Sequence, residues 1–513
     1  MKNKQLMLNM TSTILAFCVN MAINFFLTPY ITKNVGVEAY GFISLANNFV
    51  MYASLITIAL NSMIGRFITI EIHSGNYEQA NKYFSSSVYA NVFIGTILML
   101  PALFIVFFLN NLLVIPSDIV LDVKLLFLFI FINFSLSVIN ASYSTATFAT
   151  NRLDLNAKIN IVSYIIKGML LLGLFVIFRP HVLYVGVVSC VVSSYILIKN
   201  IYYTKKLLPD VKVQKKFFDF NAIWLVIKSG IWNTVTKLGQ ILTDGLDLLI
   251  TNLFITAAAM GQFSIVKTIT TTLSAFVSTF AGVFSPQQTI DYAKGNLDVV
   301  VKDFKFSMKL TGIVAACMMC CLLIFGYDFY SLWVPDEDVA LLAIVSIVSI
   351  ISQLATSAIV PLWQIFTITN KLKINALVHV FVGIFNTIVV FVLIKYTDLG
   401  IIAVAGVSSV TAMIKNLIYT PLYSAHCLGV KKTIFYPEIF RYLFTTVVIT
   451  AVYYGLYNLI SVDSWLTLIL SVTICGFVGL LISYLIMFNK AERKRIIELM
   501  KKKLFRSMRN ENN

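Results

Sequence analysis

The chain has few charged residues. They make up 12% of its 513 residues, whereas hydrophobic residues make up 59%; soluble domains carry roughly 25% charged residues. A soluble globular protein is therefore excluded, and a chain that spans a bilayer is expected. The 23 acidic residues and four histidines form no cluster outside the apolar stretches. We therefore expect no metal site, no nucleotide-binding loop and no catalytic residues.

Cysteine is also scarce, and most of the seven cysteines lie inside apolar stretches. Cys317-x-x-Cys320-Cys321 has the outline of a redox or metal motif, but no histidine or carboxylate lies near it in the sequence. We interpret these cysteines as small core residues. All loops between the apolar stretches are short, so the sequence predicts no soluble catalytic domain, no enzyme activity and no cofactor.

Long apolar runs are what the chain does have. A helix needs about 20 apolar residues to cross a bilayer, and fourteen stretches meet this length. They are 7–30, 42–64, 85–109, 121–141, 159–178, 182–203, 222–249, 262–285, 306–327, 340–365, 376–396, 400–423, 440–460 and 466–488.

The net charge of +16 is distributed unevenly. With the N-terminus in the cytoplasm, most lysines and arginines fall in cytoplasmic loops, as the positive-inside rule requires. Both termini are therefore predicted to be cytoplasmic. The lysines and arginines that fall on the outer side of the membrane are Lys33, Lys124, Arg179 and Lys395. The basic segment 490–509 is typical of an interfacial helix on anionic lipid rather than of nucleic-acid binding.

The sequence repeats itself after about 220 residues. Because each copy would hold six crossings, an even number, both copies enter the membrane in the same direction. The repeat is then parallel, with a pseudo-two-fold axis along the membrane normal. The repeated elements are T-N-R-L-D-L-N-A (150–157) with T-N-K-L-K-I-N-A (369–376), I-K-N-I-Y-Y-T (198–204) with I-K-N-L-I-Y-T (414–420), Gly75-Asn76 with Gly295-Asn296, and Gly41 with Gly261.

The repeat predicts the organisation of the chain. We expect an all-α polytopic membrane protein with 14 transmembrane helices, built as two parallel six-helix repeats plus two C-terminal helices. The predicted parts are an N-terminal lobe (1–204), a cytoplasmic linker (205–221), a C-terminal lobe (222–424), helices 13 and 14 (425–489) and a basic cytoplasmic tail (490–513).

The seventh stretch carries the most polar residues. Asn233, Lys237, Gln240, Asp244 and Asp247 follow one another in steps of 4, 3, 4 and 3, which would place all five on one face of a helix. Polar groups are costly in hydrocarbon and face a cavity or a partner. The stripe would therefore line a cavity, or else Lys237 pairs with an aspartate and the stripe only joins the lobes.

The repeat points to the residues that would face this stripe. Each pair combines a neutral amide in one copy with a charged or larger polar group in the other, and the lysines would give the cavity a positive potential that suits an anionic substrate. The pairs are Asn20 with Gln240, Asn24 with Asp244, Asn47 with Lys267, and Lys167 with Asn386.

Three further charged positions have two interpretations each, and a fourth has one. Arg66, at the foot of the second stretch, either guards the cytoplasmic mouth or anchors the helix. Asp244 and Asp247 are candidates for proton or sodium coupling, and a static ion pair is the alternative. Lys309, near a cytoplasmic helix end, is expected to snorkel.

Several motifs resemble one known family. The turn V-G-V-E-A-Y-G-F (35–42), the G-R-F-I foot (65–68) and the loop S-G-N-Y-E-Q-A-N-K-Y (74–83), together with the 6+6+2 arrangement, resemble bacterial polysaccharide repeat-unit flippases of the O-antigen and capsule type. Their superfamily includes multidrug-and-toxin extrusion pumps and the lipid II flippase. The resemblance implies a V-shaped two-lobe transporter in the bacterial inner membrane.

The resemblance also implies a function and partners. Undecaprenyl-diphosphate-linked oligosaccharide would move from the cytoplasmic to the outer leaflet for surface polysaccharide biosynthesis, with cationic groups receiving the diphosphate and a proton or sodium gradient driving the cycle. Partners would be the lipid-linked substrate, the membrane, a polysaccharide polymerase and glycosyltransferases, and the protein would be a monomer. The alternative is an ion-coupled multidrug or small-molecule antiporter, which fits less well because Asn20 and Asn24 stand where many such pumps have an acid.

Overall fold

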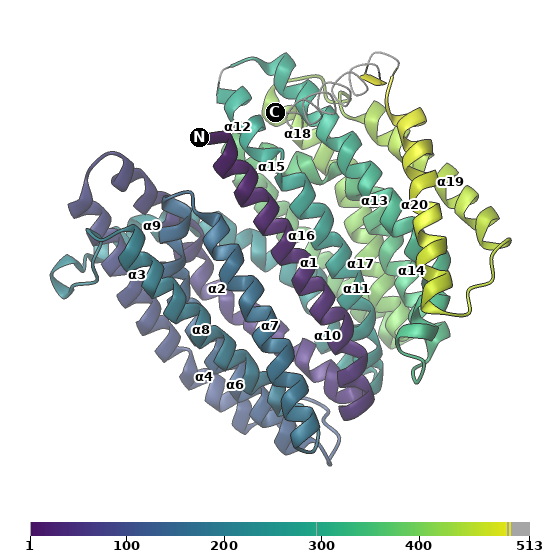
Figure 1. Ribbon diagram of the computed structural model, residues 1–513, viewed down its shortest axis with the longest axis horizontal. Coiled ribbons are helices and arrows are strands. Elements are labelled where there is room, and N and C mark those ends of the chain that lie inside the picture. The colour runs from purple at the N-terminus through teal and green to yellow at the C-terminus, as the bar shows by residue number, and fades with distance from the viewer. Residues whose placement is uncertain (1, 294, 490–491, 494–513) are drawn as a thin grey trace, which may run out of the picture. The chain divides into compact units, whose positions relative to one another are not determined.

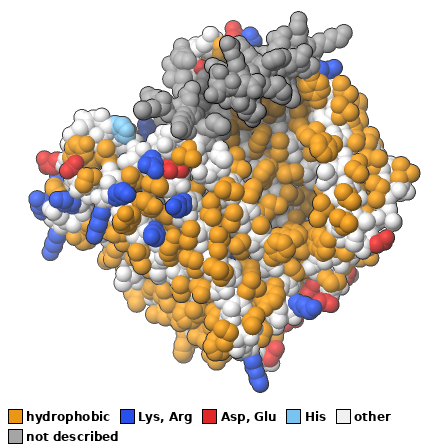
Figure 2. All heavy atoms as spheres, viewed as in Figure 1, with side chains coloured by type: hydrophobic (Ala, Val, Ile, Leu, Met, Phe, Trp, Pro, Cys, Tyr) orange, Lys and Arg blue, Asp and Glu red, His pale blue; other side chains and the backbone are white. Residues whose placement is uncertain are grey.

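The computed structural model describes residues 2–293, 295–489 and 492–493, and this part of the chain is built from helices (Figure 1). Thirteen of its helices are long and apolar enough to cross a membrane, and they coincide with thirteen of the predicted stretches. The remaining stretch, 222–249, is helical as well but is broken in its middle. Hydrophobic side chains cover most of the face shown in Figure 2. The chain is a multi-pass, all-α membrane protein.

Backbone contacts divide the chain into two compact units. Unit 1 comprises Met1–Thr268 and Leu372–Ser408, and unit 2 comprises Ile269–Lys371 and Ser409–Asn513. These units follow packing, whereas the predicted lobes follow the repeat, so the lobe boundaries stay a prediction. The predicted tail 490–513 lies outside the described residues except for Glu492 and Arg493.

The elements of unit 1 include the broken helix. They are α1 (Lys2–Val35), α2 (Val37–His73), α3 (Tyr77–Ile97), α4 (Met99–Phe107), α5 (Leu109–Leu112), α6 (Val120–Ala149), α7 (Leu153–Ile177), α8 (Leu183–Leu207), η1 (Lys215–Phe217), α9 (Phe220–Gln240), η2 (Ile241–Gly245), α10 (Asp247–Phe254) and α16 (Leu372–Tyr396). Two helices contribute residues to both units: α11 (Ala257–Gly282) and α17 (Ile401–Ile414).

Unit 2 contains the helices that end the chain. Its elements are α12 (Ser285–Ala293), α13 (Leu297–Trp333), α14 (Val339–Thr356), η3 (Ser357–Leu362), α15 (Trp363–Ile368), η4 (Lys415–Tyr419), α18 (Thr420–Leu428), α19 (Tyr436–Tyr457) and α20 (Trp465–Met487).

The two copies predicted from the sequence recur in the backbone. Gly75 and Gly295 both have a positive φ, at 79° and 76°, and Asn151 and Asn370 both have a φ of 55°. Most residues avoid this left-handed region. Its occurrence at equivalent positions therefore indicates that the two copies share a backbone conformation there. The starts of α2 and α11, and those of α3 and α13, are likewise about 220 residues apart. The duplication of the sequence is therefore a duplication of structure.

Gly41 and Gly261, at equivalent positions of the two copies, lie against each other. A Cβ atom on Gly41 would come within 2.8 Å of the Gly261 Cα, and one on Gly261 within 2.2 Å of the Val37 carbonyl oxygen. Small residues at both positions let the backbones of α2 and α11 approach closely.

We expect Gly261→Ala to destabilise the protein. No rotamer change can relieve a clash made by Cβ itself, so α2 would have to move, and overpacking of this kind costs about 1–3 kcal/mol. The loss is measured as a lower melting temperature of the detergent-solubilised protein. Gly282→Ala on the same helix is the control, because a Cβ there meets nothing within 4 Å. Equal losses in both variants would contradict this packing.

Helix α6 packs against α2, α3 and α8 of unit 1. Amide and hydroxyl groups join it to its neighbours within the apolar packing. The Asn91 Nδ2 of α3 donates to Ser142 Oγ at 2.9 Å, and the Asn200 Nδ2 of α8 donates to Asn140 Oδ1 at 2.8 Å. Such bonds fix the register of helices that lipid cannot drive together by hydrophobicity.

In unit 2, α13 packs against α14, α19 and α20. Cys317, Cys320 and Cys321 are buried in the apolar cluster between these helices, where small residues allow close packing. The sequence interpretation of these cysteines as core residues agrees with their position.

Unit 2 also holds a buried ion cluster. Lys309 on α13 is only 3% exposed, and its Nζ lies 2.7 Å from Glu492 Oε1 and 3.6 Å from Glu438 Oε2. Arg441 Nη1 lies 3.3 Å from the same Glu438 oxygen. The expectation that Lys309 snorkels is wrong, because two carboxylates hold its ammonium group inside the unit.

Lys309→Met should destabilise unit 2, because Glu438 and Glu492 would lose the cation they share. Breaking a buried pair costs on the order of 3 kcal/mol, measured as thermal unfolding in detergent. Lys302→Met is the control, since Lys302 is exposed on the same helix, and an equal loss there would refute a role for the cluster.

Burial raises the pKa of Glu492, but hydrogen bonds from Lys309 and the backbone hold it below its usual value. The contribution of Glu492 to stability should thus be present at neutral pH and disappear as the pH falls through this lowered pKa.

Candidate functional site

The candidate site in unit 1 is a break in the seventh predicted crossing. The α-helical pattern of α9 ends at Gln240, and a π-helical turn, η2, follows before α10 begins at Asp247. The Leu246 N–H donates to the Ile241 carbonyl at 3.1 Å, a step of five residues instead of four. A π turn frees backbone carbonyls from the regular ladder and is frequent at functional sites. In a membrane these carbonyls need other partners.

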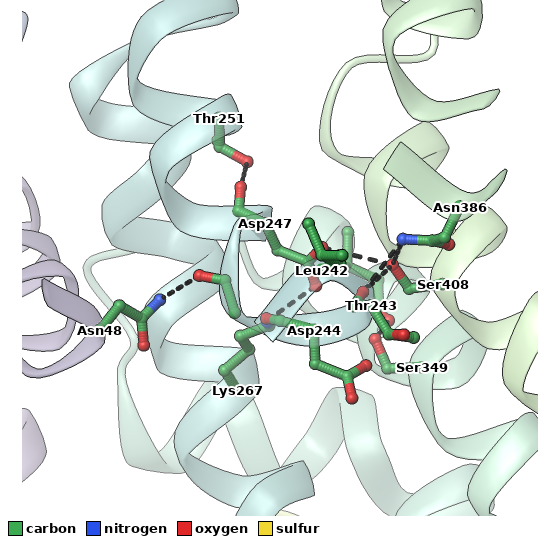
Figure 3. Close-up of polar contacts among 12 residues, drawn as sticks. Asn48, Leu242, Thr243, Asp244, Asp247, Thr251, Lys267, Ser349, Asn386 and Ser408 are labelled. Atoms are coloured by element: carbon green, nitrogen blue, oxygen red, sulfur yellow. Dashed lines mark hydrogen bonds and ion pairs between the residues drawn. The ribbon is translucent and has the colours of Figure 1, made fainter. Parts of the chain in front are cut away.

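Helices α16 and α17 supply partners for the first two freed carbonyls. Thr387 Oγ1 donates to the Leu242 carbonyl at 3.0 Å. Asn386 Nδ2 and Ser408 Oγ both donate to the Thr243 carbonyl, at 3.0 and 3.1 Å. Figure 3 shows Asn386 and Ser408 pointing at this turn from their two helices.

Helices α2 and α11 supply partners for the next two carbonyls. Asn48 Nδ2 and Tyr52 Oη donate to the Gly245 carbonyl at 3.0 and 2.6 Å. Lys267 Nζ donates to the Asp244 carbonyl at 2.6 Å. Side chains from four helices thus hold the broken turn in place.

A buried ion pair lies next to the turn (Figure 3). Asp247 is 4% exposed, and its Oδ2 lies 2.7 Å from Lys267 Nζ. Ser408 Oγ lies 3.3 Å from Asp247 Oδ1, and the Lys267 ammonium lies 5.2 Å from the centre of the Phe263 ring. The carboxylate has a countercharge, as a buried charge requires.

The π turn changes the predicted polar stripe. Asn233 and Lys237 are half-buried, Gln240 and Asp244 are exposed, and Asp247 is buried. An extra residue in the turn rotates the chain beyond Asp244, so the steps of 4, 3, 4 and 3 no longer keep Asp247 on the common face. The prediction of one face for all five is wrong at Asp247. The alternative, in which Lys237 pairs with an aspartate, does not apply to Asp247, because Lys267 occupies that place.

The amides predicted from the first copy, Asn20, Asn24 and Asn47, form hydrogen bonds within their own helices. Asn24 Nδ2 donates to Asn20 Oδ1 at 3.0 Å, on a helix, α1, that packs mainly against α7. Asn47 is exposed, and its amide donates to the Ile43 carbonyl of its own helix at 2.9 Å. The structure therefore joins Asn20 with Asn24 but brings neither into contact with the Asp247 pair.

The remaining predicted residues lie toward other parts of unit 1. Asn233 Nδ2 of α9 donates to Ser62 Oγ of α2 at 3.1 Å, and Arg66 is exposed on α2. Among the described residues, Lys167 and Lys237 form no hydrogen bond and no ion pair within 4 Å. Of the three lysines predicted to face the cavity, Lys267 forms an ion pair with a carboxylate, and Lys167 and Lys237 form none within 4 Å among the described residues.

Sequence reasoning missed four residues that build the site: Asn48, Tyr52, Thr387 and Ser408. Each acts on the backbone of η2 and shows no periodic signal of its own. The usable signal was Gly245, a glycine inside a polar stretch of a membrane helix, because interrupted helices mark binding regions in transporters. The described residues contain no group of three or more His, Cys, Asp or Glu that could hold a metal.

Solved structures with the same fold are transporters and flippases. The lipid II flippase MurJ in an inward-closed conformation matches with a TM-score of 0.65 and 14% identity, over 93% of this chain and 98% of that one. The chain has the fold of MOP-superfamily transporters. An inward-facing multidrug-resistance MATE transporter matches with a TM-score of 0.63 and 12% identity, over 83% of this chain and 98% of that one.

A bacterial membrane protein is similar to this chain in sequence. The uncharacterized membrane protein EpsK of Bacillus subtilis is 28% identical over 497 residues, which cover 96% of this chain and 98% of that protein. No protein-family model matches the chain.

Proposed function

We propose that the protein is a flippase. It moves undecaprenyl-diphosphate-linked oligosaccharide repeat units from the cytoplasmic to the outer leaflet of the inner membrane, by alternating access, for surface polysaccharide biosynthesis. The observation that carries this proposal is that two lysines in predicted membrane crossings, Lys167 and Lys237, have no carboxylate of the described residues within 4 Å. A cation without an ion-pair partner inside a membrane is costly and fits an anionic ligand.

The chemistry of the substrate agrees with these groups. A diphosphate would receive positive charge from Lys167 and Lys237, whereas saccharide hydroxyls would receive hydrogen bonds from amides such as Gln240 and Asn233. The lipid tail can remain in the bilayer, so only the headgroup needs a polar path. The match to the lipid II flippase also spans more of this chain, 93%, than the match to the MATE transporter, 83%.

A reconstituted system tests the proposal. The purified protein is placed in vesicles with undecaprenyl-diphosphate that carries a fluorescent disaccharide, and a membrane-impermeant reagent that destroys the label reports which leaflet holds it. We expect the protein to equilibrate the label between leaflets, and protein-free vesicles to keep it on one side. No movement above the protein-free rate would overturn the proposal.

The second candidate function is ion-coupled export of drug-like molecules. The MATE match favours it, and so does the buried carboxylate of Asp247. The same vesicles distinguish the two functions when they are loaded with ethidium and given a proton or sodium gradient. Ethidium movement without movement of the lipid-linked label would replace the flippase by the antiporter.

A further inference from the structure

The segment between α8 and α9 is not a loose linker. We call residues 208–219 the strap, because this segment lies along α3 and is held there. Leu208 and Val211 are buried in an apolar cluster that includes Tyr83 and Phe84 of α3 and Ile223 of α9. The strap thus has an inner apolar side that belongs to the core of unit 1.

Three polar side chains of α3 fix the backbone of the strap. Asn81 Nδ2 donates to the Asp210 carbonyl at 2.9 Å, and Asn81 Oδ1 accepts the Lys212 N–H at 2.6 Å. Ser85 Oγ donates to the Lys212 carbonyl at 2.9 Å, and Ser86 Oγ accepts the Asp219 N–H at 2.8 Å. These bonds hold the strap at both ends and in its middle, so its outward side chains start from fixed positions.

The outer side of this region is basic and aromatic. Figure 2 shows Lys and Arg side chains gathered near the end of the molecule where α3, α8 and α9 lie together in Figure 1. Two acidic residues, Asp210 and Asp219, lie in the same stretch. The exposed lysines are Lys205, Lys206, Lys212, Lys215 and Lys216. The exposed aromatic residues beside them are Tyr202, Phe218, Phe220 and Trp224.

This combination matches the surface of a membrane. Aromatic side chains at the ends of membrane helices lie at the level of the lipid headgroups, and Phe220 and Trp224, in the first turns of α9, are 68% and 60% exposed. Lysines just beyond that level are attracted to anionic headgroups. Lys216 also lies 4.8 Å from the centre of the Phe217 ring, so charge and aromatic surface are adjacent.

We propose that the strap is a binding surface for anionic phospholipid headgroups of the cytoplasmic leaflet. The lysines bind the phosphates, and the exposed aromatic residues enter the interface beside them. Because the strap leads directly into α9, bound lipid holds the start of α9. This helix carries Lys237 and is followed by η2. This proposal is independent of the transported substrate.

The test uses the full-length protein in detergent. Binding of phosphatidylglycerol and of phosphatidylcholine is measured by native mass spectrometry for the wild type and for the triple variant Lys212→Gln/Lys215→Gln/Lys216→Gln. Each lysine near an anionic surface contributes about fivefold to binding, so we expect the triple variant to lose on the order of 100-fold in phosphatidylglycerol affinity. Lys431→Gln/Lys432→Gln, at exposed positions of another turn, should bind as the wild type does.

A second variant tests the role of the fixed backbone. Ser85→Ala/Ser86→Ala keeps every lysine but removes two of the three side chains that hold the strap, and we expect it to bind phosphatidylglycerol several-fold more weakly. The proposal fails if the triple variant binds like the Lys431/Lys432 variant, or if the wild type does not prefer phosphatidylglycerol to phosphatidylcholine. Lysine-dependent capture of an acidic soluble protein in place of lipid would also overturn it.

Discussion

A Lys237→Met protein should move the lipid-linked label at least about tenfold more slowly than the wild type, while reaching the membrane at a normal level. Lys237 makes no ion pair within 4 Å among the described residues, so its removal leaves no buried partner without a countercharge. The loss should therefore appear in transport rather than in stability. A charge-assisted contact contributes about 1.5–3 kcal/mol, which corresponds to a factor of about ten or more.

The matched control for this variant lies on the same helix. Lys228 is exposed on α9, so Lys228→Met removes an equal charge from the protein without touching the candidate site, and it should transport normally. Lys167→Met should resemble Lys237→Met, and the double variant should lose more than either. If Lys237→Met and Lys228→Met move the label equally fast, Lys237 does not receive the diphosphate.

The fold was largely predictable because its determinants are local and periodic. Each crossing is predicted by its own apolar run. The duplication is indicated by short turns such as T-N-R-L and T-N-K-L, whose asparagines share a φ of 55°. A left-handed residue needs a particular side chain at a particular place, so it leaves a trace in the sequence.

The site was less predictable because its geometry depends on one irregular turn. A periodic interpretation assumes 3.6 residues per turn throughout, and the π turn at Ile241–Gly245 breaks that assumption between Asp244 and Asp247. The side chains that allow the break, such as Tyr52 and Ser408, come from helices far away in sequence. Their role is visible only when the freed carbonyls are matched with donors.

The same limit explains why the sequence could not distinguish the paired lysine from the two others. In the sequence, Lys167, Lys237 and Lys267 look alike, as single cations in apolar stretches. In the structure Lys267 is held by a carboxylate and a backbone carbonyl, whereas the other two form no ion pair within 4 Å among the described residues. Pairing is a property of three-dimensional contact, so spacing along one helix could suggest Lys237 as the partner of Asp247 and still be wrong.

Breaking the Asp247–Lys267 pair should have the largest effect on stability of any change in unit 1. Lys267→Met leaves a buried carboxylate without its cation, and Asp247→Asn leaves a buried ammonium group without its anion, so each single variant should lose about 3–5 kcal/mol. The Lys267 variant also loses the donor to the Asp244 carbonyl. We expect both proteins to unfold at lower temperature in detergent and to transport poorly.

The double variant Asp247→Asn/Lys267→Met separates a structural role from an ion-coupling role. It removes both charges together, and replacing both members of a buried pair is often nearly neutral. If the pair only holds η2, the double variant should recover most of the stability lost by either single variant, together with transport that still responds to an imposed proton or sodium gradient. We expect this outcome, because Lys267 already supplies the cation that Asp247 needs, and a coupling role would then fall to the exposed Asp244, which Asp244→Asn tests directly. A double variant that is stable but transports at the same rate with and without a gradient would instead place the coupling step at Asp247.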